Sequence, residues 1–399
     1  MTEKRRYRAR VWVLYICILL VAQEAFFRIV CPVPEITNFN RIDYTPLQVA
    51  PEALQEGLLS RASYTIGSEP DDVEFVHQLN LYGFRDVECP VDSSTPRVMF
   101  VGDSFTEGFM ADGADTIPSS FSDAAAASGR DLAVMNMGIG GAGLEQYCKL
   151  IRDAVPIFRP EFVVLVLYTN DVPTTVDVDS WFVDRRTSQR FNRWMPRGVD
   201  TVMRLLRREG VPLAWHRPPF SFFSPVPAES NPWSAAEVPA TVDPEIADAM
   251  RRGTFNPHVF NELVWSEGFL RNRMDILPHL TAIEEYVSAY GTRVSLVYLP
   301  DRHSISDAYR EHALKFSVDS ETQSFMTPEL QGHGTQLAAI ASQLDTPFLD
   351  LTPVIMEREE RGVRCYHDYD AHMLGETYTF VGQTLYDWWV QSAGRTDIQ

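Results

Sequence analysis

Short apolar runs alternate with helix-like segments over the first half of the chain. The runs 98–101, 132–137 and 161–168 predict three strands, and the spacing of apolar positions predicts helices at 119–128 and 144–158 between them. The run at 161–168 (EFVVLVLY) is apolar almost throughout, which is typical of a strand in a parallel sheet covered by helices on both faces. This part of the chain therefore predicts an α/β fold.

The same alternation returns near the end of the chain. The pattern there predicts a helix around 277–290, a strand at 293–299, a helix around 334–344, a strand at 347–351 and a final helix at 379–391. Together, the two parts predict an open three-layer α/β/α sandwich with a mainly parallel sheet.

Three segments depart from this alternation. Residues 33–95 are polar and loop-rich and predict a lead-in region, whereas 173–274 are rich in proline and aromatic residues and predict an insertion. The main domain then consists of residues 96–172 and 275–392. Within the insertion, residues 191–208 are basic and amphipathic, which fits either contact with a membrane surface or a helix packed on the domain.

The first 32 residues have the character of a targeting segment. They begin with five basic side chains: Lys4, Arg5, Arg6, Arg8 and Arg10. The apolar run 11–22 follows, and this order is typical of a signal peptide or a signal anchor. Because no clear small-residue cleavage site follows and residues 25–30 can extend the run, we predict an uncleaved, single-pass transmembrane helix. The N-terminus would be cytoplasmic and the main domain extracytoplasmic; secretion after signal cleavage is the alternative.

Charge and cysteine content exclude two classes of function. The formal net charge is −19 even with the basic N-terminus included, so the chain would repel a nucleic-acid backbone. The five cysteines form no CxxC or His–Cys cluster, so no structural zinc site is predicted. In an exported protein Cys89, Cys148 and Cys365 could supply one disulfide, and the sequence leaves its pairing open.

The strongest candidate for chemistry is the string RVMFVGDSFTEG at 97–108. The strand at 98–101 breaks at Gly102 and Asp103, and Ser104 stands where the chain turns into a helix. A serine at a tight strand-to-helix turn exposes its hydroxyl above the sheet edge, and its own N–H can face an oxyanion. This geometry suits a nucleophilic serine; a polar loop without chemistry is the alternative.

The string resembles the first signature block, GDS-x-T-x-G, of the SGNH or GDSL-type hydrolases, which are flavodoxin-like α/β serine esterases. The segment 80–85 (NLYGFR) resembles an element that precedes this block in exported members. The glycine-dense turn 136–143 resembles the second block and places the family's oxyanion glycine at Gly141. Asn170 corresponds to the asparagine of the third block, Gly-x-Asn-Asp, although a larger residue replaces the glycine here.

The glycine-dense turn also matches GxGxxG, the dinucleotide-binding fingerprint, at Gly138, Gly140 and Gly143. The match follows the second predicted strand rather than the first, and no acidic residue lies at the expected distance. We therefore predict no dinucleotide cofactor.

The resemblance places the catalytic base shortly before the final helix, where His372 lies in HDYDAH. The family's commonest spacing, Asp-x-x-His, would need an acid at Tyr369. Asp370, two residues before the histidine, gives the Asp-x-His spacing that SGNH-like proteins of exopolysaccharide systems often use, so this resemblance implies Asp370 as the acid, with Asp368 as a second candidate. Of the nine histidines, His303 is interpreted as a loop histidine or a substrate contact, and His333 as a turn or cap residue.

Together these residues predict a serine ester hydrolase. Ser104 attacks the ester carbonyl, His372 takes its proton, and Asp370 orients the imidazole. The oxyanion is bound by the N–H groups of Ser104 and Gly141 and by the side-chain amide of Asn170. No metal or organic cofactor is required. The expected substrate is a carbohydrate or small-molecule ester with an acetyl-like acyl group. The alternatives are an O-acetyltransferase for a cell-envelope polysaccharide and a catalytically silent sugar-binding or assembly protein on the same fold.

Overall fold

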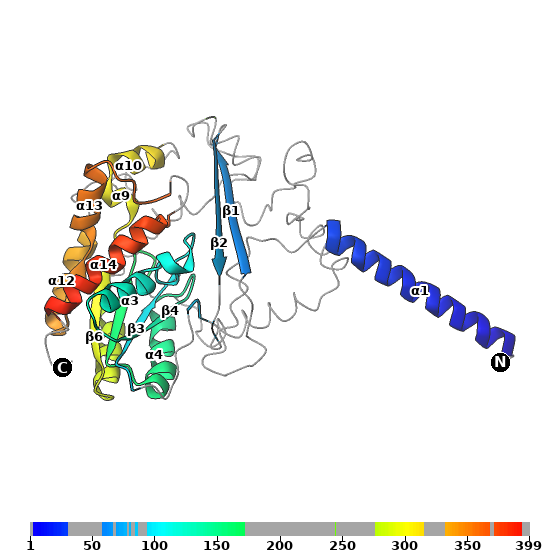
Figure 1. Cartoon of the computed structure of the whole chain (residues 1–399), viewed down its shortest axis with the longest axis horizontal. Coiled ribbons are helices and arrows are strands. Elements are labelled where there is room, and N and C mark those ends of the chain that lie inside the picture. The colour runs from blue at the N-terminus through cyan, green and yellow to red at the C-terminus, as the bar shows by residue number, and fades with distance from the viewer. Residues whose placement is uncertain are drawn as a thin grey trace.

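The computed structural model describes residues 3–30, 58–66, 69–77, 80, 84–86, 94–171, 244, 276–314, 332–367 and 371–392. Most of these residues form one α/β domain, in which helices cover a five-stranded sheet (Figure 1). The insertion predicted at 173–274 lies, except for residue 244, outside the described residues.

The sheet is parallel throughout its described strands. These are β3 (Arg97–Gly102), β4 (Ala133–Gly138), β5 (Phe162–Leu167), β6 (Arg293–Tyr298) and β7 (Phe348–Asp350). Their spatial order is β4-β3-β5-β6-β7, with every neighbouring pair parallel. This is the order of a flavodoxin-like sheet, in which the connections proceed to opposite sides from β3 and β5. The carboxyl ends of all these strands share one edge, which confirms the predicted parallel α/β architecture.

Helices form a layer on each face of the sheet (Figure 1). One layer contains α3 (Ile117–Ala127), α13 (Thr352–Glu360) and α14 (Gly375–Ser392). The other contains α4 (Leu144–Phe158), α12 (Gly332–Gln343) and the helical residues 276–288. Strand β5 shows why its sequence is continuously apolar. Val163 and Leu165 belong to the core under α4, whereas Phe162 and Val164 belong to the core under α14.

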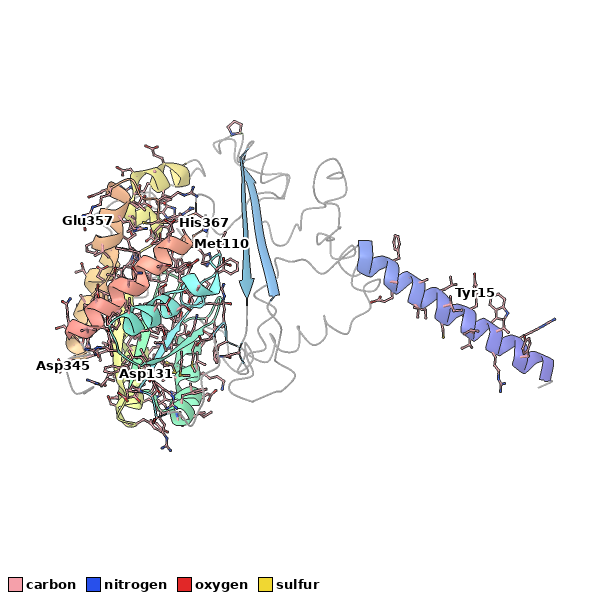
Figure 2. The ribbon with its side chains drawn as sticks, in the orientation of Figure 1. Tyr15, Met110, Asp131, Asp345, Glu357 and His367 are labelled. Atoms are coloured by element: carbon pink, nitrogen blue, oxygen red, sulfur yellow. The ribbon has the colours of Figure 1, made fainter. Side chains whose placement is uncertain are left out.

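Short helices follow two strands at the carboxyl edge. The single turn α2 (Ser104–Glu107) follows β3, and α9 (Arg302–Ile305) and α10 (Asp307–Leu314) follow β6. A 3₁₀ turn, η3 (Gly113–Asp115), leads into α3. Met110, just after α2, and His367 lie at the same end of the domain (Figure 2). Asp131 and Asp345, which precede β4 and β7, lie at the opposite end.

Two strands lie within the segment that the sequence indicated to be loop-rich. β1 (Leu58–Ile66) and β2 (Glu69–His77) form an antiparallel pair. The sequence of β2, EPDDVEFVH, begins with a proline and three acidic residues among its first four positions, so it contains no apolar run that would predict a strand.

The predicted transmembrane helix is not supported. Residues Glu3–Val30 do form one helix, α1. However, no helix among the described residues is long and apolar enough to span a membrane. The reason lies in the sequence, because the uninterrupted apolar run 11–22 is much shorter than the ~20 residues that a bilayer requires. Arg10 precedes this run and Gln23 and Glu24 follow it, so a longer window takes in charged residues.

The described cysteines Cys17, Cys148 and Cys365 are free thiols. The disulfide considered from the sequence is therefore not formed between Cys148 and Cys365. Burial raises the pKa of the Cys148 thiol to about 11, so this thiol is protonated at neutral pH.

Candidate active site

Ser104 is the first residue of α2, directly after β3, as the sequence predicts. Asp103 caps this helix, because its Oδ1 accepts a hydrogen bond of 2.9 Å from the Phe105 N–H. Gly102 permits the close approach of the turn to the sheet. A Cβ at this position would overlap the Thr106 side chain and lie 3.0 Å from the Val166 carbonyl oxygen. Tight packing at the strand end thus determines where the Ser104 hydroxyl lies.

The imidazole of His372 lies against Ser104. His372 Nε2 is 2.8 Å from Ser104 Oγ, although 268 positions separate the two residues in the sequence. Phe105 stacks on the imidazole with ring centroids 4.8 Å apart, and the Phe109 ring lies at 4.7 Å. Ser104 and His372 are each only 5% exposed. The aromatic rings fix the plane of the imidazole and exclude most water from the serine–histidine pair.

The loop that carries His372 is closed at its base. An isolated antiparallel bridge joins Tyr366 to Met373, and the His367 N–H donates to the His372 carbonyl at 3.1 Å. Arg302, from α9, donates through Nη1 to the His367 carbonyl at 2.8 Å. The predicted acids lie within this loop, at 368 and 370, and both fall outside the described residues. The described geometry therefore contains the predicted base and nucleophile but does not test the acid.

Asn170 follows β5, on the strand next to Ser104. Its Nδ2 donates a hydrogen bond of 2.9 Å to Asp103 Oδ2. The two residues therefore lie where the connections from β3 and β5 diverge, which is the usual ligand-binding position of an open α/β sheet. Burial raises the pKa of Asp103, while its hydrogen bonds from Phe105 and Asn170 and the nearby His372 oppose this shift. The carboxylate orients the Asn170 amide, because only the nitrogen side can face it.

Asp171, beside Asn170, is buried and fixes the same turn. It accepts hydrogen bonds from the Tyr147 hydroxyl at 2.6 Å and from the Tyr168 N–H at 2.8 Å. Burial, followed by the negative charge of Asp103, raises the pKa of Asp171 well above its usual value. Asp171 has no predicted role of its own in the sequence, where the only signal for it is that it follows Asn170 in the Asn-Asp pair.

Gly141 lies at the surface in the turn after β4, with a φ of 72°. This turn packs closely on α2. A Cβ on Gly138 would overlap the backbone of Glu107, so only glycine permits the contact. The Gly140 N–H donates to Glu107 Oε2 at 2.8 Å. The structure therefore brings the predicted oxyanion glycine to the same sheet edge as Ser104 and Asn170.

The segment around Arg85 belongs to this domain and contacts the residues just after α2 and strand β4. Arg85 donates to the carbonyl oxygens of Gly108 and Ala111, just after α2. Asp86 Oδ2 accepts a hydrogen bond of 2.7 Å from the Asn136 N–H in β4. These contacts could not be predicted from the sequence because they join residues far apart in the chain.

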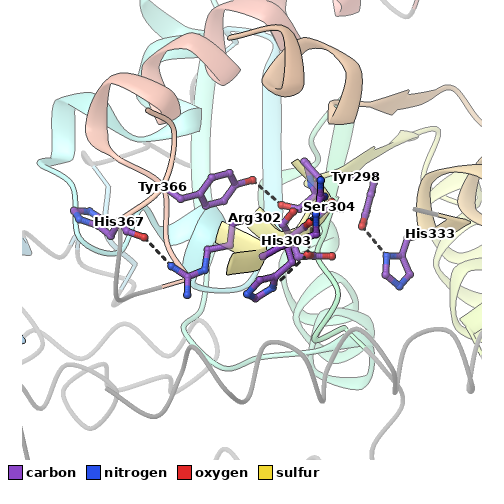
Figure 3. A network of polar contacts seen from close by, with 10 residues as sticks. Tyr298, Arg302, His303, Ser304, His333, Tyr366 and His367 are labelled. Atoms are coloured by element: carbon purple, nitrogen blue, oxygen red, sulfur yellow. Dashed lines mark hydrogen bonds and ion pairs between the residues drawn. The ribbon is translucent and has the colours of Figure 1, made fainter. Parts of the chain in front are cut away.

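The two other histidines considered above lie after β6 and at the start of α12, in a network of polar contacts that also contains Arg302 and His367 (Figure 3). His333 Nδ1 is 3.0 Å from the Tyr298 hydroxyl, and His303 Nδ1 is 3.6 Å from Asp301 Oδ1. Hydrogen bonding and charge from His303, with a contribution from His333, lower the pKa of Asp301 despite its desolvation.

Within the described ranges, no group of three or more His, Cys, Asp or Glu side chains could hold a metal ion.

A flavodoxin-like sheet with a serine–histidine pair at its carboxyl edge defines the class of α/β serine hydrolases. Residues 98–201 match the model of one such family, described as GDSL-like Lipase/Acylhydrolase. The match places Ser104, Gly141 and Asn170 within a GDSL-like lipase/acylhydrolase domain. No curated protein matches the chain.

Solved structures with similarity to the chain include the following three. TesA shares 12% identity over 73% of this chain and 97% of its own, with a TM-score of 0.37. A lipase/acylhydrolase from Enterococcus faecalis shares 12% identity over 74% and 95%, with a TM-score of 0.36. The acetylxylan esterase Axe2 from Geobacillus stearothermophilus shares 11% identity over 76% and 95%, with a TM-score of 0.38. Similarity at this level identifies no substrate.

Proposed function

We propose that the protein is an esterase that removes short, acetyl-like acyl groups from a carbohydrate or small-molecule ester, with Ser104 as the nucleophile. The observation that carries this proposal is the 2.8 Å contact between His372 Nε2 and Ser104 Oγ. The imidazole takes the serine proton as Oγ attacks the ester carbonyl, and it returns a proton to the departing alcohol. Water then attacks the acyl-enzyme by the same base catalysis and releases the acid.

The proposed oxyanion donors come from three elements at the sheet edge. They are the N–H groups of Ser104 and Gly141 and the side-chain amide of Asn170. The hydrogen bond from Asn170 to Asp103 engages one hydrogen of the amide nitrogen and leaves the other for the oxyanion. Donors held in place before the reaction stabilise the developing charge without reorganisation, which makes them effective.

The proposed acid is Asp370, with Asp368 as the second candidate. Since Nε2 of His372 is used on Ser104, an orienting carboxylate must act on Nδ1, and both aspartates lie in the loop that carries the histidine. Asp103 supplies a second negative charge close enough to interact with His372. Such a charge favours the imidazolium ion that forms when Ser104 loses its proton.

The proposal includes a location outside the cytoplasm. The basic cluster followed by the apolar run 11–22 supports export, because this order is typical of segments that direct a chain across a membrane. A reporter enzyme that is active only after export, fused behind residue 57, should be active in cells. An inactive but full-length fusion would contradict this location.

The test of the proposed function uses an aryl acetate and a fluorophosphonate probe. Ser104→Ala should abolish both turnover and labelling, because it removes the hydroxyl that is proposed to form the acyl-enzyme. Ser288→Ala is the matched control, since this serine bonds to Glu284 on an exposed helix face and should leave both unchanged. Full turnover in Ser104→Ala would refute the proposal. Acyl transfer to an added oligosaccharide, measured against hydrolysis, separates an esterase from an acetyltransferase.

A further inference from the structure

Glu107 is a buried carboxylate to which the proposed reaction assigns no role. It is the last residue of α2, three positions after Ser104, and is only 2% exposed. Its Oε2 accepts a hydrogen bond of 2.8 Å from the Gly140 N–H. Gly140 is joined by one peptide bond to Gly141, the proposed oxyanion donor. The carboxylate thus connects the helix that carries the nucleophile with the turn that carries a donor.

Arg85 compensates the charge of Glu107. A buried carboxylate is strongly unfavourable unless a partner offsets the loss of hydration. Burial lowers the pKa of the Arg85 guanidinium, and the charge of Glu107 is the largest of the opposing effects. Arg85 also donates to the Glu107 carbonyl at 3.4 Å and to the carbonyls of Gly108 and Ala111. It therefore holds the backbone at the end of α2 while the Glu107 side chain reaches the glycine turn.

The glycine turn needs such support from outside. Glycine loses more conformational freedom on ordering than any other residue, and positions 140, 141 and 143 are all glycines. Gly141 adopts a φ of 72°, in the left-handed region. At the far end of the turn, the Gln146 side chain accepts a hydrogen bond of 3.0 Å from the Gly143 N–H. Glu107 is the side chain that anchors the turn next to Gly141.

We propose that Glu107 is a positioning residue, which holds the Gly140–Gly141 peptide so that the Gly141 N–H is directed at the oxyanion above Ser104. This inference rests on the proposed function. Because Ser104 and Glu107 share a single helical turn, the nucleophile and the oxyanion donor keep one relative position. A donor that is fixed before the reaction contributes more to the transition state than to substrate binding, so its loss lowers kcat more than it changes KM.

The decisive comparison is between Glu107→Gln and Glu107→Met in the full-length chain. Both side chains are uncharged and of similar length, so both deprive Arg85 of its charge partner equally. Only glutamine keeps an oxygen that can accept the Gly140 hydrogen bond. We expect kcat for an aryl acetate to be about 10- to 100-fold lower in Glu107→Met than in Glu107→Gln, with KM within about threefold.

Two further variants distinguish a positioning role of Glu107 from a failure to fold and from a purely structural role. Glu107→Asp keeps the charge beside Arg85 but withdraws the acceptor from Gly140, so it should also lower kcat. Asp350→Ala is the control, because Asp350 likewise accepts from a backbone N–H, that of Thr352 at 2.8 Å, on the edge strand β7. It should lower the thermal midpoint while leaving kcat within about twofold.

Equal kcat values in Glu107→Gln and Glu107→Met, or a wild-type kcat in Glu107→Asp, would overturn the inference. Glu107 would then be only the charge partner of Arg85. That result would leave the proposed function intact, provided that Ser104→Ala is inactive. Conversely, a wild-type protein that neither hydrolyses the ester nor reacts with the fluorophosphonate would refute the proposed function itself.

Discussion

Two of the buried histidines at the carboxyl edge of the sheet, His372 and His333, each contact a hydroxyl group, and only His372 has the geometry of a catalytic base. His372 and His333 are 5% and 3% exposed, and each has a ring nitrogen within 3.0 Å of a hydroxyl oxygen. The hydroxyl beside His372 belongs to Ser104, at the strand-to-helix turn after β3. The hydroxyl beside His333 belongs to Tyr298, in β6.

The difference lies in the partner and its surroundings rather than in the histidine. Burial raises the pKa of the Tyr298 phenol well above its usual value, and the charges of Asp301 and Asp350 act in the same direction. This hydroxyl therefore stays protonated and serves as a structural hydrogen-bond donor. Ser104, by contrast, follows β3, which lies between β4 and β5, and the turns after these two strands carry the proposed oxyanion donors Gly141 and Asn170. Burial and a hydrogen bond are thus insufficient to identify a catalytic base. Hydrogen-bond donors for the developing oxyanion must also lie beside the hydroxyl group.

Exchange of each histidine for alanine gives the largest expected contrast between the two sites. His372→Ala should lower kcat for an aryl acetate by at least about 1000-fold, because it removes the proposed general base. His333→Ala should leave kcat of the folded protein within about threefold. It should instead lower the thermal midpoint, since the buried Tyr298 hydroxyl loses its partner. Comparable kcat values in the two variants would remove the distinction between the sites.

Asn170 supplies the next largest effect. Asn170→Ala should lower kcat by about 100- to 1000-fold, as expected for loss of a side-chain oxyanion donor. KM and the circular dichroism spectrum should change little. Gln343→Ala, which removes an exposed amide at the end of α12, is the control. A loss of less than about threefold in Asn170→Ala would exclude this amide from the oxyanion site.

Most of the α/β domain could be predicted because its strands are largely apolar. The run at 161–168 predicted a strand buried on both faces, and β5 occupies Phe162–Leu167 in the centre of the sheet. The final helix begins at Gly375, whereas the prediction began at 379. The prediction missed the first turn, GETY, because this turn carries no apolar periodicity. The strand pair β1 and β2 was not predicted, because acidic residues occupy much of β2 and leave no apolar run.

The serine–histidine pair could be predicted, but the residues that support it could not. Ser104, Gly141, Asn170 and His372 stand in recognisable motifs at the ends of predicted elements. Glu107 and Arg85 act through contacts that join α2 to positions 22 to 33 residues away in sequence, and no local pattern encodes such contacts. The predicted transmembrane helix is not supported, because a basic segment before an apolar run is typical of targeting segments whether or not the run is long enough to span a bilayer.

The smallest expected effect concerns Asp171 and the pH dependence of thermal stability. It tests the electrostatics of the buried residues beside the site rather than the catalytic reaction. Its pKa is raised well above the usual value by burial and then by Asp103. An acid whose pKa is higher in the folded state contributes stability at low pH, and this contribution is lost as the pH rises through the folded pKa. The wild-type thermal midpoint should therefore decrease as the pH rises from about 4 towards neutrality.

Asp171→Asn should flatten this pH dependence. The amide oxygen can still accept from the Tyr168 N–H, and the amide nitrogen can donate to the Tyr147 hydroxyl oxygen, so both partners stay bonded. The midpoint near neutral pH should change by about 2–4 °C for each 1 kcal/mol that the ionised carboxylate costs. Asp123→Asn, an exposed change in α3, should reproduce the wild-type slope. If Asp171→Asn also keeps that slope, Asp171 does not determine the pH dependence of stability.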